Sequence, residues 1–299
     1  MTQFAELTIA GLALGAIYSL IAVGFVMVYR SSGLLNFAQG EFATLGAFLM
    51  TTFAAWAVLP WPVALLLTVL VMMAVGMGIE RVIMRKLLGR PPFIGSIVTI
   101  FVGFLLSVAV LWIYGSSTRA MPTPWDPVKI VEVGGVEFTL TNLVTILVAI
   151  VLIGTLAFVM QRTPMGMAMR AVADDQEAAF ALGIPVERLL GLTWGIAASL
   201  GAVAGVFLAM FPRSATVAMG LLAFRAFPAV IIGGLESPVG AIIGGSALGL
   251  LQVHGEYYVN PHLGDFGIGF HLVLAFIVMI AFLMIKPHGL FGTKELERV

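Results

Sequence analysis

Two charged residues interrupt apolar stretches of the chain, and they are its best candidates for chemistry inside a membrane. Glu41 follows Asn36 and Gln39 in the sequence NFAQGEF, where a long apolar run begins, and Arg225 stands in a second apolar stretch. A charge at the centre of a membrane helix costs about 2.5 to 3.5 kcal/mol on insertion scales, so it faces protein or water and is commonly functional. We therefore expect Asn36, Gln39, Glu41 and Arg225 to line a translocation path. The alternative is structural: Glu41 is solvated at the interface and Arg225 pairs with an acid such as Glu236.

The polar stretch 161–190 is the second notable feature, because it holds seven of the chain's charged residues. Its centre predicts a short helix that Asp174 caps, with Glu177 reaching back to the cap three residues later. Gly183 supplies a left-handed residue after the last turn, and Pro185 prevents continuation. This helix is too short to be stable alone, and it leaves four side chains exposed: Ala178, Ala179, Phe180 and Leu182. We expect it either to enter a groove of a partner protein or to rest on the lipid interface.

No motif for intrinsic catalysis accompanies these features. The four histidines, at positions 254, 262, 271 and 288, lack metal-ligand spacing, and the chain has no cysteine. It also lacks a phosphate-cradling GxxxxGK[ST] loop, a GxSxG elbow and an HExxH helix. A net charge of zero gives no case for nucleic-acid binding. We predict no catalytic residue, metal or cofactor on this chain, so that if ATP drives the protein, another chain hydrolyses it.

The elements that must position these residues are membrane helices. Hydrophobic residues make up 61% of the chain, charged residues 10%, and the mean hydropathy is +1.10. A membrane-crossing helix needs about 20 apolar residues, and runs of about that length or more lie at 7–29, 42–79, 91–118, 138–161, 189–212 and 266–285, with a shorter run at 237–255. The second run is long enough for two spans. We predict an all-α polytopic integral membrane protein, a single domain over 1–299, with eight to nine membrane segments.

Two connecting stretches depart from this plan. Residues 213–234 carry Arg225 and Pro228 and end in a glycine pair, which predicts a short, broken or re-entrant segment packed within protein. Residues 115–139 alternate apolar and polar residues around Gly134-Gly135, which predicts a β-hairpin. This hairpin either caps the helices or contacts an external partner.

The basic residues predict the orientation. With 161–190 in the cytoplasm, eleven of the 15 Lys and Arg residues fall on the cytoplasmic side, as the positive-inside rule expects. They are Arg30, Arg81, Arg85, Lys86, Arg90, Arg162, Arg170, Arg188, Lys286, Lys294 and Arg298. The N-terminus is then outside, the C-terminus is cytoplasmic, and the hairpin at 115–139 is extracytoplasmic.

Four motifs together resemble the membrane permeases of branched-chain amino-acid ABC importers. They are ALGAIYSLIAVG at 13–24, GLLNFAQGEF at 33–42, RAVADDQEAA at 170–179 and PHGLFG at 287–292. This chain has Gln39 where that permease signature reads histidine. The resemblance implies that the helix within 161–190 is a coupling helix that inserts into a cytoplasmic ATPase. The coupling positions it implies are Asp174, Asp175, Glu177, Ala178, Ala179, Phe180 and Gly183.

The resemblance also implies an assembly in a bacterial inner membrane. It would join this chain to a paralogous second permease, two cytoplasmic ATPase subunits that hold ATP and magnesium, and an extracytoplasmic substrate-binding protein. The expected solute is a branched-chain or related hydrophobic amino acid; urea, short amides and aromatic acids are the alternatives. Two readings of other classes stay open: an ion-coupled secondary transporter, with Glu41 and Arg225 as its coupling groups, and a membrane scaffold without transport.

Overall fold

The computed structural model describes residues 2–210 and 214–292, and helices form most of it. The α-helices are α1 Thr2–Ser32, α2 Gln39–Thr51, α3 Trp61–Val82, α4 Pro92–Tyr114, α5 Leu140–Arg162, α6 Pro164–Asp174, α7 Gln176–Ala181, α8 Val186–Leu208, α9 Met219–Ala223, α10 Phe227–Gly233, α11 Pro238–His254 and α12 Phe270–Ile285. Short 3-10 or π segments are η1 Thr52–Trp56, η2 Met84–Leu87, η3 Phe224–Ala226, η4 Gly255–Val259 and η5 Asn260–Gly267. The strands are β1 Ile130–Val133 and β2 Val136–Thr139.

Five helices within the described residues are long and apolar enough to cross a membrane. They are α1, α3 with η2, α4, α5 and α8, and two shorter apolar helices span Met219–Gly233 and Phe270–Ile285. The prediction of an all-α, multi-pass membrane protein is therefore confirmed at the level of fold class. The number of crossings and their orientation remain predictions.

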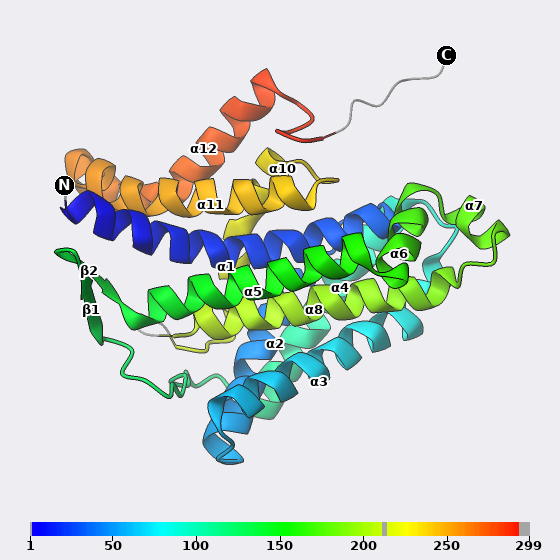
Figure 1. The fold of residues 1–299 in the computed structure, drawn as a ribbon, viewed down its shortest axis with the longest axis horizontal. Helices are drawn as coiled ribbons and strands as arrows, with labels where there is room; N and C mark the ends of the chain where they lie inside the picture. The colour runs from blue at the N-terminus through cyan, green and yellow to red at the C-terminus, as the bar shows by residue number, and fades with distance from the viewer. Residues whose placement is uncertain (1, 211–213, 293–299) are drawn as a thin grey trace.

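The helices pack in layers around α1 and α8. In Figure 1, α11 runs along one side of α1, and α5 and α8 run along the other. Helix α3 packs along α8 in turn. Lipid tails are as apolar as leucine, so hydrophobicity alone does not drive one membrane helix against another. The inner helices are instead those whose backbones can approach each other closely. At Gly15 a Cβ would lie 2.7 Å from Ser246 Cα of α11, which leaves no room for a side chain.

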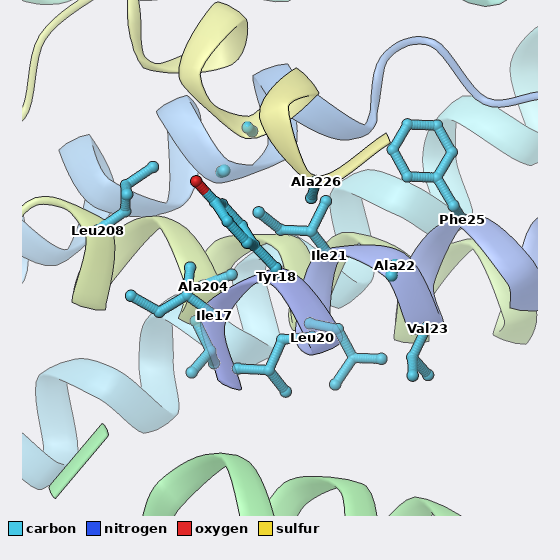
Figure 2. Packing of buried hydrophobic residues seen from close by; sticks show 14 of the residues in the cluster. Ile17, Tyr18, Leu20, Ile21, Ala22, Val23, Phe25, Ala204, Leu208 and Ala226 are labelled. Carbon is cyan, nitrogen blue, oxygen red and sulfur yellow. The ribbon is translucent and has the colours of Figure 1, made fainter. Parts of the chain in front are cut away.

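Apolar side chains on α1 fill the centre of the molecule. Figure 2 shows Tyr18, Ile21 and Phe25 of α1 among Ala204 and Leu208 of α8 and Ala226 of η3. The Tyr18 hydroxyl donates to Gln252 Oε1 of α11 at 2.6 Å, and both residues are buried. This buried polar pair adds a directional bond to the α1–α11 contact.

The two ends of the helix bundle carry different structures. The N-terminal end of α1 lies near the hairpin, whereas α6 and α7 lie at the opposite end (Figure 1). The strands pair antiparallel with Val133 opposite Val136, and Gly134 and Gly135 both have positive φ, at 63° and 82°. The predicted hairpin is thus present in the predicted turn, because only residues without a Cβ enter that turn without strain.

The stretch predicted to be broken is indeed interrupted. Over 219–233 an α-turn, the 3-10 segment η3 and α10 follow one another, with Pro228 in the first turn of α10 and Gly234 ending it at φ +101°. Helix α9 contacts α2, and α10 contacts α11, so the segment is packed within protein. Arg213, where the predicted segment begins, lies outside the described residues, as do Lys294 and Arg298 of the predicted cytoplasmic set.

Candidate functional site

The short helices α2 and α9 meet at their first turns, and we call this contact the seam. Gly40 of α2 lies directly on the carbonyl of Gly220 of α9, so a Cβ on either glycine would collide with the other helix. Helix α2 begins there because Asn36 Oδ1 accepts the backbone N–H of Ala38 at 3.1 Å and turns the chain. The seam joins two segments that are each too short to cross a membrane as ordinary helices.

Asn36 and Gln39 are fully buried and hydrogen-bonded within the protein. Asn36 Nδ2 donates to Gln39 Oε1 at 3.3 Å, and Gln39 Nε2 donates to the Ala197 carbonyl of α8 at 2.9 Å. Gln39 also fills the space beside Gly24 of α1 and Gly201 of α8, where a Cβ would contact its amide. In this state the two amides tie α2 to α1 and α8 and face no open space.

Glu41 lies at the seam itself. Its carboxylate rests on Gly220, where a Cβ would stand 3.0 Å from Oε2 and still closer to Oε1. Oε2 is buried without any partner among the described residues, and the hydroxyl of Thr44, one turn later, donates to the Gly40 carbonyl at 3.4 Å. A buried, unpaired carboxylate oxygen is costly. Glu41 therefore places an unsatisfied acceptor at the contact between α2 and α9.

Arg225 is half-buried on η3, and no ion pair joins it to Glu41 in the described part of the chain. An aromatic cluster that the sequence reasoning missed stands beside it. Phe37 stacks on Phe224 with ring centroids 6.2 Å apart, and Phe25 meets Phe227 edge-on at 5.9 Å. The sequence FRAF signals this cluster, because two phenylalanines flank the arginine.

The stretch 161–190, which we call the coupling loop after the role that the resemblance predicts for it, differs from its prediction in two ways. It contains an additional helix, α6, whose last residue is Asp174, so the cap of α7 falls one residue later. Asp175 Oδ1 accepts the N–H of Ala178 at 2.9 Å, and the N–H of Asp175 itself donates to Ala171. The predicted capping box between Asp174 and Glu177 is therefore wrong, because α6 uses Asp174 in its own last turn.

The second correction concerns exposure. Ala179 is buried, with 2% of its surface exposed, and its carbonyl accepts the N–H of Ile184 in the turn into α8. Phe180 and Leu182 are 74% and 80% exposed, as predicted, and Ala178 and Glu177 are exposed beside them. Gly183 follows the helix at φ +78°, the left-handed conformation predicted for it. The large apolar side chains exposed here are thus Phe180 of α7 and Leu182 directly after its last residue.

The coupling loop lies next to the end of α1. Gln176 Nε2 donates to the Ser31 carbonyl at 2.6 Å, and Arg30 Nη2 lies 3.3 Å from Asp174 Oδ1. A cavity of about 830 Å³ opens between this end of α1, the α6–α7 junction and the turn before α11. In the described residues no cluster of three or more His, Asp or Glu side chains could hold a metal ion.

The arrangement defines a class first: a multi-pass membrane protein with a packed helical interior, a broken inner segment and a polar helical loop at one end. The family model described as "Branched-chain amino acid transport system / permease component" matches residues 7–283. The chain therefore belongs to this permease family, whose members are transporter subunits and not enzymes.

The individual relatives agree with the family match. The chain is 32% identical to the high-affinity branched-chain amino acid transport system permease protein BraD of Pseudomonas aeruginosa, over 99% of this chain and 98% of the relative. It is 32% identical to the permease protein LivH of Salmonella typhimurium, over 97% and 96%. It is 26% identical to a probable LivH of Methanocaldococcus jannaschii, over 94% and 90%. No solved structure matches the chain.

Proposed function

We propose that this chain is the membrane permease of an ABC importer for branched-chain amino acids in a bacterial inner membrane. The observation that carries the proposal is the match to permeases of that name over nearly the whole of both chains. A second, paralogous permease completes the membrane channel, two cytoplasmic ATPase subunits hold ATP and magnesium, and an external binding protein delivers the solute.

Helix α7 is the docking element for the ATPase in this proposal. It presents the exposed side chain of Phe180, with that of Leu182 directly after its last residue. An aromatic residue and a leucine on a short capped helix suit the helix-in-groove mode of recognition. ATP binding moves the ATPases, and α7 carries that movement into the membrane helices. This alternating access requires the two states to differ in their contacts at α7.

The translocation path opens at the seam. Its contributors are Asn36, Gln39, Glu41 and Arg225, in two different roles. Asn36 and Gln39 anchor α2 through buried hydrogen bonds, while Glu41 and Arg225 offer opposite charges to a zwitterionic solute when α2 and α9 part. The neighbouring phenylalanines provide an apolar surface for a branched aliphatic side chain.

Reconstitution tests the function directly. The complex of this chain with its second permease and ATPases is placed in liposomes, and ATP-driven uptake of labelled leucine is measured with the binding protein present. We expect uptake that needs ATP and is inhibited by unlabelled isoleucine and valine. Uptake of urea, short amides or aromatic acids instead would assign another solute, and uptake by the chain alone under an ion gradient would contradict the importer proposal.

A single substitution tests the path. Glu41→Gln is expected to lower leucine uptake about tenfold, because it removes the negative charge that meets the solute's ammonium group. The matched control is Glu256→Gln, an exposed carboxylate in η4 that lies outside both the seam and the coupling loop. Normal uptake by the Glu41→Gln complex, at normal expression, would remove Glu41 from the path.

A further inference from the structure

One arginine joins α3 to the start of α8 at the coupling-loop end. Arg85, in η2, donates from Nε to Glu80 Oε1 at 3.2 Å and from Nη2 to Glu80 Oε2 at 2.7 Å. It also donates from Nη1 to Glu187 Oε2 at 3.1 Å and from Nη2 to the Glu187 carbonyl at 3.0 Å. We call Glu80, Arg85 and Glu187 the Arg85 clamp. A planar guanidinium makes this set of bonds, whereas the single ammonium of lysine does not.

The clamp is anchored inside the protein. The Glu80 side chain is only 2% exposed, and its Oε2 lies 3.2 Å from where a Cβ on Gly191 of α8 would stand. A carboxylate so deeply buried is stable only with a charged partner. Arg85 is that partner, and it reaches outward to Glu187, which is exposed. Glu80 therefore holds Arg85 in place, and Arg85 holds the start of α8.

Helices α3 and α8 pack closely along their contact. A Cβ on Gly195 of α8 would lie 2.9 Å from Met77 Cγ of α3, and a Cβ on Gly76 would lie 2.8 Å from the Ala198 Cβ. Ser199 Oγ donates to the Val69 carbonyl at 3.1 Å and adds a fixed register. With the Arg85 clamp closed, the two helices form one rigid pair.

The coupling helix is continuous with this pair. The N–H of Ile184 donates to the Ala179 carbonyl at 3.0 Å, and the N–H of Leu189 donates to the Pro185 carbonyl at 3.2 Å, so the corner from α7 into α8 is hydrogen-bonded throughout. Glu187 lies in the first turn of α8, directly after this corner. A displacement of α7 therefore reaches Arg85 before it reaches the rest of α8.

The other ion pair of the coupling loop is much weaker. Arg30 and Asp174 meet through one contact of 3.3 Å, and their side chains are 35% and 71% exposed. Solvent-exposed pairs of this kind contribute little. The two links thus differ in the number of bonds, in burial and in what they join.

From this contrast we propose that Arg85 is the positioning residue that transmits movement of the coupling helix to α3. Arg85 makes α3 and α8 turn as one unit, and the Gln39–Ala197 bond extends that unit to the start of α2 at the seam. The proposal rests on the function proposed above. It implies that loss of the Arg85 clamp separates ATP hydrolysis from transport, whereas loss of the Arg30–Asp174 pair does not.

The test uses the assembled complex in liposomes, with ATP hydrolysis and leucine uptake measured on the same preparation. The double variant Glu80→Gln/Arg85→Gln leaves no lone buried charge, so it keeps the fold while it removes the clamp. We expect about a tenfold fall in leucine transported per ATP hydrolysed, at an unchanged rate of hydrolysis. Arg81→Gln, an exposed arginine at the same end of α3, is the control and keeps the parent ratio.

A cross-link distinguishes mechanical transmission from other roles of Arg85. The chain has no cysteine, so Met77→Cys and Gly195→Cys, at a contact where a Cβ on Gly195 would lie 2.9 Å from Met77 Cγ, introduce one pair of thiols between α3 and α8. In the Glu80→Gln/Arg85→Gln background, oxidation is expected to restore the parent ratio and reductant to remove it again. An unchanged ratio in the double variant, or a fall that the cross-link does not repair, would overturn the proposal.

The rate of cross-linking gives a readout that needs no solute. With the clamp intact, the disulfide should form at the same rate with and without ATP, because α3 and α8 move together. Without the clamp, addition of ATP should slow it several-fold. If ATP leaves the cross-linking rate unchanged in the double variant as well, the Arg85 clamp is refuted. This holds even where the solute proves to be something other than leucine.

Discussion

Helices α5 and α8 flank the coupling loop and have the same length of 23 residues, yet they occupy opposite environments. In the apolar stretch of α8, 89% of the residues are buried inside the protein, against 11% in that of α5. Helix α5 is the more apolar of the two, whereas α8 carries glycines at 191, 195, 201 and 205. In a membrane, high hydropathy marks the surface that faces lipid, and small residues mark the surface that faces other helices.

The largest expected effect comes from replacing a glycine of α8, and the same replacement in α5 serves as its control. Gly205 of α8 lies against the Ala43 backbone, where a Cβ would come within 2.5 Å of the carbonyl carbon, whereas a Cβ on Gly154 of α5 would meet nothing within 4 Å. Gly205→Val should destabilise the protein by about 3 kcal/mol, the upper end for overpacking. Gly154→Val should leave it unchanged. Thermal unfolding of the purified variants in detergent measures both, and equal effects would contradict the assignment of α8 to the interior.

A medium effect is expected from the polar contact that α8 makes with the seam. Gln39→Leu removes the bond to the Ala197 carbonyl and leaves the buried Asn36 amide without its partner, at a cost of about 2 kcal/mol. Thr155→Leu, at an exposed position of α5, is the control and should be neutral. Thermal unfolding again provides the comparison. A neutral Gln39→Leu variant would mean that this buried hydrogen bond does not stabilise α2.

The smallest expected effects come from two neighbouring carboxylates, which lie on opposite sides of the α6–α7 junction and contribute differently to stability. Asp175→Ala removes the helix cap that Ala178 donates to and should cost about 1 kcal/mol. Asp174→Asn breaks only the exposed pair with Arg30 and should cost less than about 0.5 kcal/mol. Hydrogen exchange of the α7 amides measures the difference. A larger effect from Asp174→Asn would restore Asp174 as the cap.

The outcome at the coupling loop shows where local rules reach their limit. The αL position of Gly183 and the turn at Gly134-Gly135 were predictable, because each depends on the φ angle that a single residue type permits. The cap was misplaced by one residue because the sequence rule for Asp174 does not include competition from a preceding helix. Ala179 was predicted to be exposed because its burial depends on the turn into α8, which no short pattern encodes.

At the candidate site, too, the sequence predicted some features and the fold alone determined others. The sequence marked Glu41 and Arg225 because charge is rare in an apolar chain, and the structure puts Glu41 against Gly220, almost 180 residues further along. The sequence also marked Gln39, but its contact with Ala197 comes from the packing of α2 on α8. In the sequence, Phe37 and Phe224 look like ordinary lipid-facing residues, and only the fold brings their rings together in a stack.

The sequence by itself determined that this chain is a multi-pass helical membrane protein, and its motifs marked the permease family, because composition, hydropathy and ordered motifs are properties of the chain alone. Tertiary structure decided which helices lie inside, that α2 and α9 meet at the seam, and that Arg85 joins α3 to α8. These contacts depend on the close approach of residues far apart in the sequence. Their geometry is set by small residues and buried hydrogen bonds, which leave no periodic signal along the chain.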